Sequence, residues 1–120
     1  MGKIIITFDF DGTIGHLPYV QRLARDLNMD PNNSVHIVTR RYGYLHPKEG
    51  DEVTQVRNLA QQLGIKQENL HFTNRAYKVE KLKELNSNIH YDDDYQEILY
   101  IRQHFPACLG FLVDPKTLIR

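Results

Sequence analysis

The sequence predicts an α/β fold: a three-layer α/β/α sandwich built on a five-stranded parallel, Rossmann-like sheet. The alternation of two kinds of segment along the chain leads to this prediction. Short apolar, β-branched runs alternate along the chain with longer segments in which apolar residues recur at helical spacing. Strands that alternate with helices are typical of right-handed crossovers, and therefore of a parallel sheet. Because the 120 residues contain no repeat and no linker, we expect a single domain over residues 1–120.

The composition narrows the class of protein. Fifteen Lys and Arg balance fifteen Asp and Glu, and this zero net charge indicates no broad attraction to nucleic acid or to an anionic membrane. A small basic site stays compatible with this balance. Cys108 is the only cysteine, which excludes an internal disulfide and is typical of a reducing compartment. The apolar run Ile4–Phe8 is too short to span a membrane, and no signal-peptide pattern precedes it, so we expect a cytoplasmic protein.

Hydrophobic patterning and turn residues give the order of the elements. We expect strands over residues 4–8, 35–39, 70–73, 88–91 and 109–113. We expect helices over residues 18–28, 51–63, 76–85 and 95–104. Pro18 suits a first helical turn, Gly64 follows the second predicted helix, and Pro106 marks the end of the fourth.

Polar residues that could carry chemistry stand where predicted strands end or predicted helices begin. They are Asp9 and Asp11 after the first strand, Thr39 ending the second, Lys78 opening a helix, and Asp92 and Asp93 after the fourth strand. In a parallel sheet those strand ends lie along one edge, which is where open α/β sheets bind ligands. We therefore expect these side chains to converge on one site.

The run Asp9-Phe10-Asp11-Gly12-Thr13 after an apolar strand resembles DxDGT, the first signature of the haloacid dehalogenase (HAD) superfamily. Most members of that superfamily are magnesium-dependent phosphohydrolases. The superfamily pattern continues with a Ser or Thr, a Lys and an acidic pair, which Thr39, Lys78 and Asp92-Asp93 match in the same order. The resemblance therefore spans residues 4–113. A calcium loop is disfavoured, because Ile14 and Leu17 offer no oxygen ligands where such a loop needs them.

The resemblance implies distinct roles for the two acids of the first motif. Asp9 would be the nucleophile that becomes an aspartyl-phosphate, and it would also contact the metal. Asp11 would act as general acid and base towards the leaving group and water, with its backbone carbonyl on the metal. Without the resemblance, both acids could simply end a strand and cap a turn. An aspartate at position 11 favours phosphate ester chemistry, because dehalogenases and phosphonatases of the superfamily have no acid there.

The remaining motif residues are expected to bind the substrate phosphate. By resemblance, Thr39 donates its hydroxyl to a phosphoryl oxygen, although a β-branched residue is also common at the end of a strand. Gly12 and Thr13 are expected beside the same phosphate. Arg40 and Arg41 follow Thr39 and could grip phosphate bidentately, or could be ordinary surface arginines.

The site lysine and the metal ligands are less sharply defined. Lys78 is preferred over Lys81, because a cation at the start of a helix opposes the helix dipole and so indicates a functional reason. Three adjacent acids, Asp92 to Asp94, favour a bound cation, although Asp94 is explained by a helix N-terminus. We expect Asp93 to bind Mg²⁺ directly and Asp92 to act through water or Lys78.

A magnesium ion suits this set of charges. A carboxylate that attacks a phosphate is repelled by ~4 kcal/mol for each unit-charge pair about 4 Å apart at an effective dielectric constant of ~20. Mg²⁺ held by several carboxylates, together with a lysine, offsets most of that repulsion. A nucleophilic acid, a lysine and additional acids for the metal therefore form a coherent set.

The chain has no room for the cap domain of larger HAD enzymes. Residues 14–17 alone separate the first motif from its helix, and Thr39 and Lys78 are separated by one loop, one helix and one short strand. An uncapped site is open, so the substrate, a partner or another copy of the chain must exclude water. The aromatic loop at residues 42–47 is our candidate for substrate contact, or for a surface between copies in a homo-oligomer.

These features predict a Mg²⁺-dependent phosphatase that acts on a phosphorylated small molecule or macromolecular end. Thr39-Arg40-Arg41 resembles the second motif of some polynucleotide phosphatases, which favours a nucleotide or a nucleic-acid end. Two alternatives stay open: a HAD-like binding or regulatory module with weak turnover, and a phosphotransferase.

Overall fold

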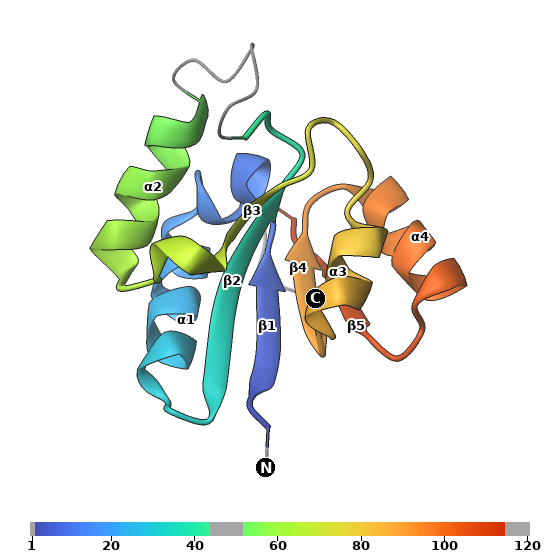
Figure 1. The fold of residues 1–120 in the computed structure, drawn as a ribbon, viewed down its shortest axis with the longest axis horizontal. Helices are drawn as coiled ribbons and strands as arrows, with labels where there is room; N and C mark the ends of the chain where they lie inside the picture. The colour runs from blue at the N-terminus through green and yellow to red at the C-terminus, as the bar shows by residue number, and fades with distance from the viewer. Residues whose placement is uncertain (1, 44–51, 115–120) are drawn as a thin grey trace.

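The computed structural model describes residues 2–43 and 52–114. Its strands are β1 (Ile4–Phe8), β2 (Asn33–Thr39), β3 (Leu70–Phe72), β4 (Ile89–Asp92) and β5 (Leu109–Leu112) (Figure 1). Its α-helices are α1 (Pro18–Met29), α2 (Glu52–Leu63), α3 (Val79–Leu85) and α4 (Tyr95–His104). In these described ranges no helix has the length and apolar character needed to cross a membrane.

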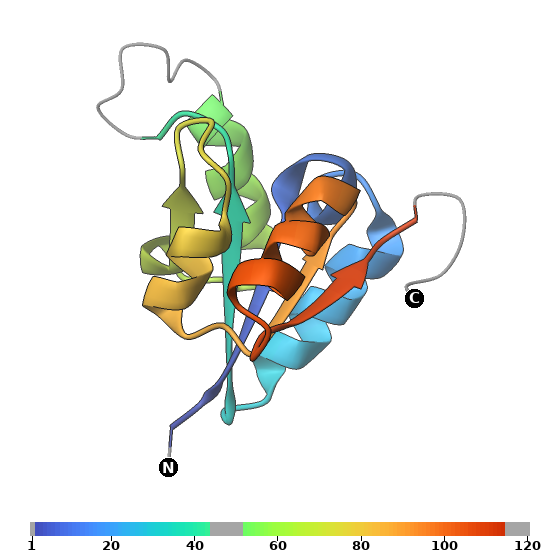
Figure 2. The same cartoon turned by 90° about the vertical axis from the view of Figure 1, so that its right-hand side faces the viewer.

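The strands form one five-stranded sheet in the order β3-β2-β1-β4-β5, and every neighbouring pair is parallel. Figure 2 shows the strand arrowheads pointing the same way. The predicted parallel α/β sheet is therefore confirmed. From the central β1 the chain moves through β2 to β3 at one edge, and then returns to place β4 on the other side of β1. The carboxyl ends of β1 and β4 thus flank the point where the strand order reverses, which is the usual ligand position in such sheets.

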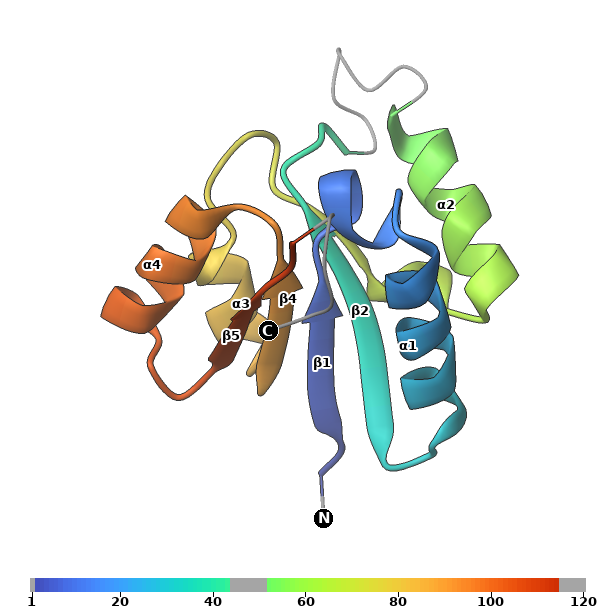
Figure 3. The same cartoon turned by 180° about the vertical axis from the view of Figure 1, so that it is seen from behind.

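Helices cover both faces of the sheet. Helices α1 and α2 lie on one side and α3 and α4 on the other, as Figures 1 and 3 show from opposite directions. Ile6 and Phe8 of β1 pack with α1 and α2 in the larger hydrophobic core. A smaller core around Leu82, Ile98 and Ile101 lies on the α3 and α4 side. Helices on both faces explain why the central strand β1 is a nearly continuous apolar run in the sequence.

The face under α3 and α4 also carries polar strand residues. Thr7 and His90 are buried there, and their Oγ1 and Nδ1 atoms are 2.7 Å apart. His36 and His71 face each other across β2 and β3, with Nδ1 of the first 2.9 Å from Nε2 of the second. One of these pairs, Thr7–His90, leads directly to the carboxyl end of β4, so this polar face links the sheet to the site described below.

Most element boundaries lie within two residues of the prediction, and α4 matches it at both ends. The start of α3 was predicted at residue 76 and is wrong by three residues, because Asn74 and Arg75 adopt left-handed backbone angles with φ of 53° and 73°. Lys78 has helical angles but caps α3 instead of lying inside its first turn. The loop before the helix is therefore longer than the apolar pattern suggests.

Candidate functional site

The parallel pairing of β1 with β4 brings the two acidic motifs together. Phe8 lies opposite Tyr91 in the register, and the Asp9 backbone N–H donates to the Tyr91 carbonyl over 2.9 Å. This extension of the ladder places Asp9 beside Asp92 at the carboxyl ends of their strands. Both residues are buried, with 5% and 0% of their surface exposed.

Lys78 is the cation that joins these two acids. Its Nζ lies 2.8 Å from Asp9 Oδ1 and 2.7 Å from Asp92 Oδ2, and the residue is 2% exposed. Burial by itself would lower the pKa of Lys78, but the charges of Asp9 and Asp92 raise it above its usual range. Lys81 instead pairs with Glu84 at 3.4 Å on the surface. Of the two lysines considered from the sequence, Lys78 is the one that reaches the acids.

Three carboxylates gather around this lysine. Asp9, Asp92 and Asp93 each offer an oxygen, and these oxygens lie within 4.8 Å of one another. Burial raises the pKa of Asp9 well above its ordinary value, and the charge of Lys78 offsets this only in part. One lysine therefore does not neutralise the charges of all three carboxylates, and carboxylate oxygens at this spacing suit a divalent cation.

Both carboxylate oxygens of Asp92 are hydrogen-bonded to protein groups. Its Oδ2 accepts from Lys78 Nζ and lies 2.8 Å from His90 Nε2, and its Oδ1 accepts from the Asp94 backbone N–H over 3.0 Å. Burial alone would raise the pKa of Asp92, but the His90 hydrogen bond and the Lys78 charge lower it to about 2. Asp9 and the exposed Asp93 are consequently the carboxylates with more freedom to bind a cation.

The turn after β1 holds Asp9 and Asp93 together. Gly12 has φ +74°, and a Cβ at this position would overlap Asp93 Oδ2, so only glycine permits the close approach. The buried Thr13 hydroxyl lies 3.2 Å from Asp9 Oδ2 and 3.4 Å from Asp93 Oδ1. The structure therefore places Thr13 and Gly12 against the acids, and neither residue lines the pocket described below.

Asp11 points to a different partner. Its carboxylate receives both prongs of the Arg41 guanidinium, with Nε to Oδ2 at 2.9 Å and Nη2 to Oδ1 at 2.7 Å. The hydrogen bond from Arg41 lowers the pKa of Asp11, although partial burial acts in the opposite direction. Arg41 is itself anchored, since its Nη1 donates to Gln55 Oε1 and to the Glu52 carbonyl. The side chain of Asp11 is thus apart from the three clustered carboxylates.

An open pocket of ≈ 430 Å³ lies over these groups. Its lining combines acids, a lysine, arginines and one threonine: Asp9, Asp11, Thr39, Arg40, Arg41, Arg75, Lys78, Asp92, Asp93 and Asp94. Eight of these ten were predicted as site residues from the sequence. Of the other two, Asp94 was assigned to a helix N-terminus and Arg75 was not considered. Thr39 is 1% exposed, and its Oγ1 accepts from the Arg41 backbone N–H over 3.3 Å.

Glu97 is a buried acid that the sequence analysis missed. Asp94 caps α4 and Glu97 follows three residues later, a spacing typical of a capping box in which the glutamate bonds back to the cap. Here the Asp94 N–H donates to Asp92, and Glu97 Oε2 accepts from the Lys78 backbone N–H over 3.1 Å. Glu97 therefore holds the backbone of the site lysine. Its Oε1 has no hydrogen-bond partner among the described residues, and Arg40 Nε lies 4.0 Å away.

The sequence analysis also missed His90, which hydrogen-bonds to Asp92 and orients its carboxylate. Because Asp92 is ionised and accepts from Lys78, His90 Nε2 carries the proton, and Nδ1 accepts from the Thr7 hydroxyl at 2.7 Å. A signal for this role was present in the sequence: residues two apart in a strand face the same side, so His90 had to lie beside Asp92.

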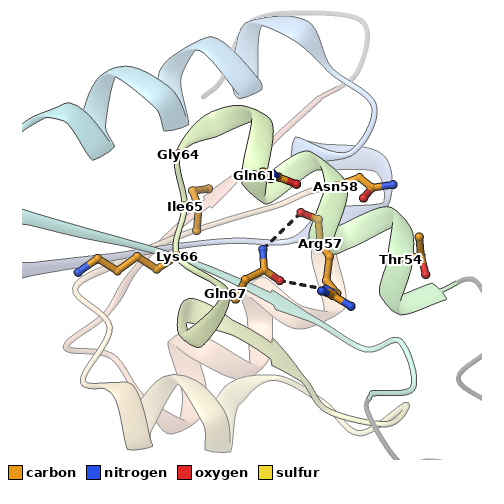
Figure 4. A pocket seen from close by; sticks show the side chains of 8 residues that line it. All are labelled: Thr54, Arg57, Asn58, Gln61, Gly64, Ile65, Lys66 and Gln67. Atoms are coloured by element: carbon orange, nitrogen blue, oxygen red, sulfur yellow. Dashed lines mark hydrogen bonds between the residues drawn. The ribbon is translucent and has the colours of Figure 1, made fainter.

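A second hollow carries no comparable chemistry. It measures ≈ 600 Å³ and lies between α2 and the segment that follows it (Figure 4). Half of its lining residues have amide or hydroxyl side chains and two are basic, and Arg57 and Gln67 form a hydrogen bond within it. It contains no acid and shares no residue with the pocket over Asp9.

No protein-family model matches the chain, and a search of curated proteins finds no match. Of the aromatic loop predicted to contact substrate, Tyr42 and Gly43 belong to the described residues and residues 44–47 lie outside them. Tyr42 supports Arg75, whose guanidinium carbon lies 4.7 Å from the centre of its ring.

Proposed function

We propose that this chain is a capless member of the HAD superfamily and a Mg²⁺-dependent phosphomonoester phosphatase that works through an aspartyl-phosphate on Asp9. The observation that supports it best is the buried Lys78, which bridges Asp9 and Asp92 where the DxDGT-like and acidic motifs meet. A purely structural role would not explain why three carboxylates cluster around a single lysine.

The donor set fits a magnesium ion. Carboxylates outnumber the one lysine among them, all of their donor atoms are oxygens, and the pocket above them is open. Asp9 and Asp93 would hold the ion with the Asp11 carbonyl, while Asp92 acts through Lys78 and water. When bound, the ion neutralises repulsion between Asp9 and the phosphate and helps to orient the phosphate.

The chain's own residues then perform two transfers. A carboxylate oxygen of Asp9 attacks phosphorus, the bond from phosphorus to the ester oxygen breaks, and Asp11 gives a proton to the departing oxygen. In the second transfer Asp11 takes a proton from water, which attacks the aspartyl-phosphate and releases inorganic phosphate. Lys78 keeps Asp9 oriented in both, and Thr39 donates a hydrogen bond to the phosphoryl group. For both transfers the Asp11 carboxylate must break its bidentate contact with the Arg41 guanidinium.

The absence of a cap is part of the proposal. Between Thr39 and Lys78 the described residues contain α2, which packs in the larger core, the short helical turn Gln67–Asn69, and β3, which is a strand of the sheet. The open pocket suits a phosphate at the end of a larger molecule, such as a nucleotide or a nucleic-acid end.

The test is phosphate release from 4-nitrophenyl phosphate with Mg²⁺ or with EDTA. We expect turnover that needs Mg²⁺ and that falls by on the order of 10⁴-fold or more in Asp9→Asn. Asp26→Asn, which changes an exposed acid paired with Arg25, is the matched control and should keep wild-type activity. Equal turnover by wild type and Asp9→Asn would overturn the proposed mechanism. Mg²⁺ binding without turnover would favour a binding module, and enhanced product formation with added alcohols would favour a phosphotransferase.

A further inference from the structure

Three arginines converge on the pocket over Asp9, and the chemistry proposed above needs none of them for the scissile phosphate. Arg40, Arg41 and Arg75 all line it. Each guanidinium also stacks on an aromatic ring, with its central carbon 4.8 Å from Tyr77 for Arg40 and 4.7 Å from the rings beneath Arg41 and Arg75. Stacking holds a guanidinium plane in place, so that its N–H donors are oriented before a ligand arrives.

The fork of Arg41 already binds an oxyanion. Both oxygens of the Asp11 carboxylate lie within 2.9 Å of its nitrogens, in the bidentate geometry that arginine also uses for phosphate. Asp11 is the residue proposed to protonate the leaving group. An anion that replaces it on Arg41 must therefore lie on the leaving-group side of the substrate, and it frees Asp11 as it binds.

Arg40 and Arg75 are fixed to each other. Arg40 donates from Nε and Nη2 to the Arg75 carbonyl, over 3.2 Å and 2.8 Å. The left-handed backbone of Arg75 presents that carbonyl to Arg40, while its side chain reaches Glu52 at 2.7 Å. The buried Glu97 carboxylate behind Arg40 lies 4.0 Å from its Nε. This network holds two further guanidinium groups beside Arg41, although no residue of the proposed reaction requires them there.

We propose that Arg40, Arg41 and Arg75 form a subsite for a second phosphate group, carried by the leaving group of the substrate. The inference rests on the proposed phosphatase function and adds a substrate class to it: phosphomonoesters whose leaving group bears a phosphodiester or another phosphate. Phosphate suits three guanidinium groups better than carboxylate does, because its tetrahedral oxygens can accept hydrogen bonds from more than one of them.

The test compares substrates that differ only in the second charge. The probe is a dinucleotide with a terminal phosphate, at the 3′ or the 5′ end, and either a charged internal phosphodiester or a neutral methylphosphonate linkage. We expect kcat/KM to be about 10- to 100-fold higher for the charged form, the range of one or two charge-assisted hydrogen bonds. A nucleoside bisphosphate is the second arm: preference for the dinucleotide indicates a chain end, and preference for the bisphosphate indicates a small molecule.

Variants separate this subsite from general attraction between charges. The ratio of charged to neutral substrate should fall towards one in Arg75→Met. It should keep its wild-type value in Arg57→Met, which removes an exposed arginine at the other hollow (Figure 4). Equal kcat/KM for both dinucleotides in wild type, or an equal fall of the ratio in both variants, would overturn the inference.

Failure of the phosphatase proposal would be recognised separately. The substrate 4-nitrophenyl phosphate has no second anion, so its turnover reports on Asp9 chemistry alone. If it is not hydrolysed, calorimetric binding of the same two dinucleotides to the wild-type protein still tests the subsite. Tighter binding of the charged dinucleotide supports the inference without turnover, and equal affinity overturns it.

Discussion

Replacement of Lys78 by methionine tests whether this lysine holds the site together. Methionine has nearly the length of lysine and is apolar, so packing changes little while the charge disappears. The Lys78 side chain is 3% exposed and contacts Asp9 and Asp92 at 2.8 Å and 2.7 Å. Its removal leaves two buried carboxylates without a cation, and breaking a buried pair in this way destabilises proteins by about 3–5 kcal/mol. This is a large part of the 5–15 kcal/mol that a domain of ordinary stability has.

The assay is urea unfolding in EDTA, with Lys81→Met as the matched control from the same segment. Lys81 is partly exposed and pairs with Glu84 at 3.4 Å, so we expect its loss to change the free energy of unfolding by less than about 1 kcal/mol. Because a divalent cation replaces the missing charge, Mg²⁺ should stabilise Lys78→Met more than it stabilises wild type. Equal destabilisation by the two substitutions, or an unchanged Mg²⁺ response, would refute the reasoning.

Two further predictions concern Mg²⁺ binding at the Gly12 turn and the pH dependence of stability at His71. Gly12→Ala and Gly64→Ala both force a side chain onto φ of 74° or 76°, at about 1–2 kcal/mol each, but only at Gly12 does the new Cβ overlap Asp93. Only Gly12→Ala should therefore weaken Mg²⁺ binding in calorimetry, and an equal loss in Gly64→Ala would contradict this. Burial and the neighbouring His36 lower the pKa of His71 to about 4, so below pH ~6.5 the unfolded chain binds a proton that the folded chain does not. Stability should fall as the pH decreases from 6.5 to 4, and His71→Gln should flatten that slope in urea unfolding at several pH values. An unchanged slope would show that His71 is not responsible.

The sequence was sufficient to predict the sheet and the convergence of the acids, because both follow from local pattern and from one topological rule. Alternation of strands and helices implies parallel strands, and parallel strands share an edge for their carboxyl ends. Asp9 and Asp92 could therefore be expected side by side before any distance was known. Lys78 was predictable for a different reason, since a cation at a helix start has no local advantage.

The partner of Asp11 could not be predicted in the same way. Its bidentate contact depends on the path of the Arg41 side chain, which α2 sets through Gln55 and the Glu52 carbonyl. Position in the sequence indicated that Arg41 lies near the site, but not which anion it binds. The prediction of the start of α3 was wrong for a related reason, because two left-handed residues in the preceding loop do not change the pattern of apolar residues.

Glu97 shows how a local rule can conceal a tertiary role. Its spacing from Asp94 satisfies a helix cap, so sequence reasoning has no motive to look further. In the structure Asp92 takes over the cap's backbone N–H, and Glu97 binds the backbone of Lys78 instead. His90 binds the far side of Asp92 in turn. The buried Asp92 thus joins β4, the cap of α4 and the site lysine, and Glu97 fixes the backbone of that lysine. A substitution at any of these residues should alter the others, so each variant of this site needs both its stability and its metal response measured.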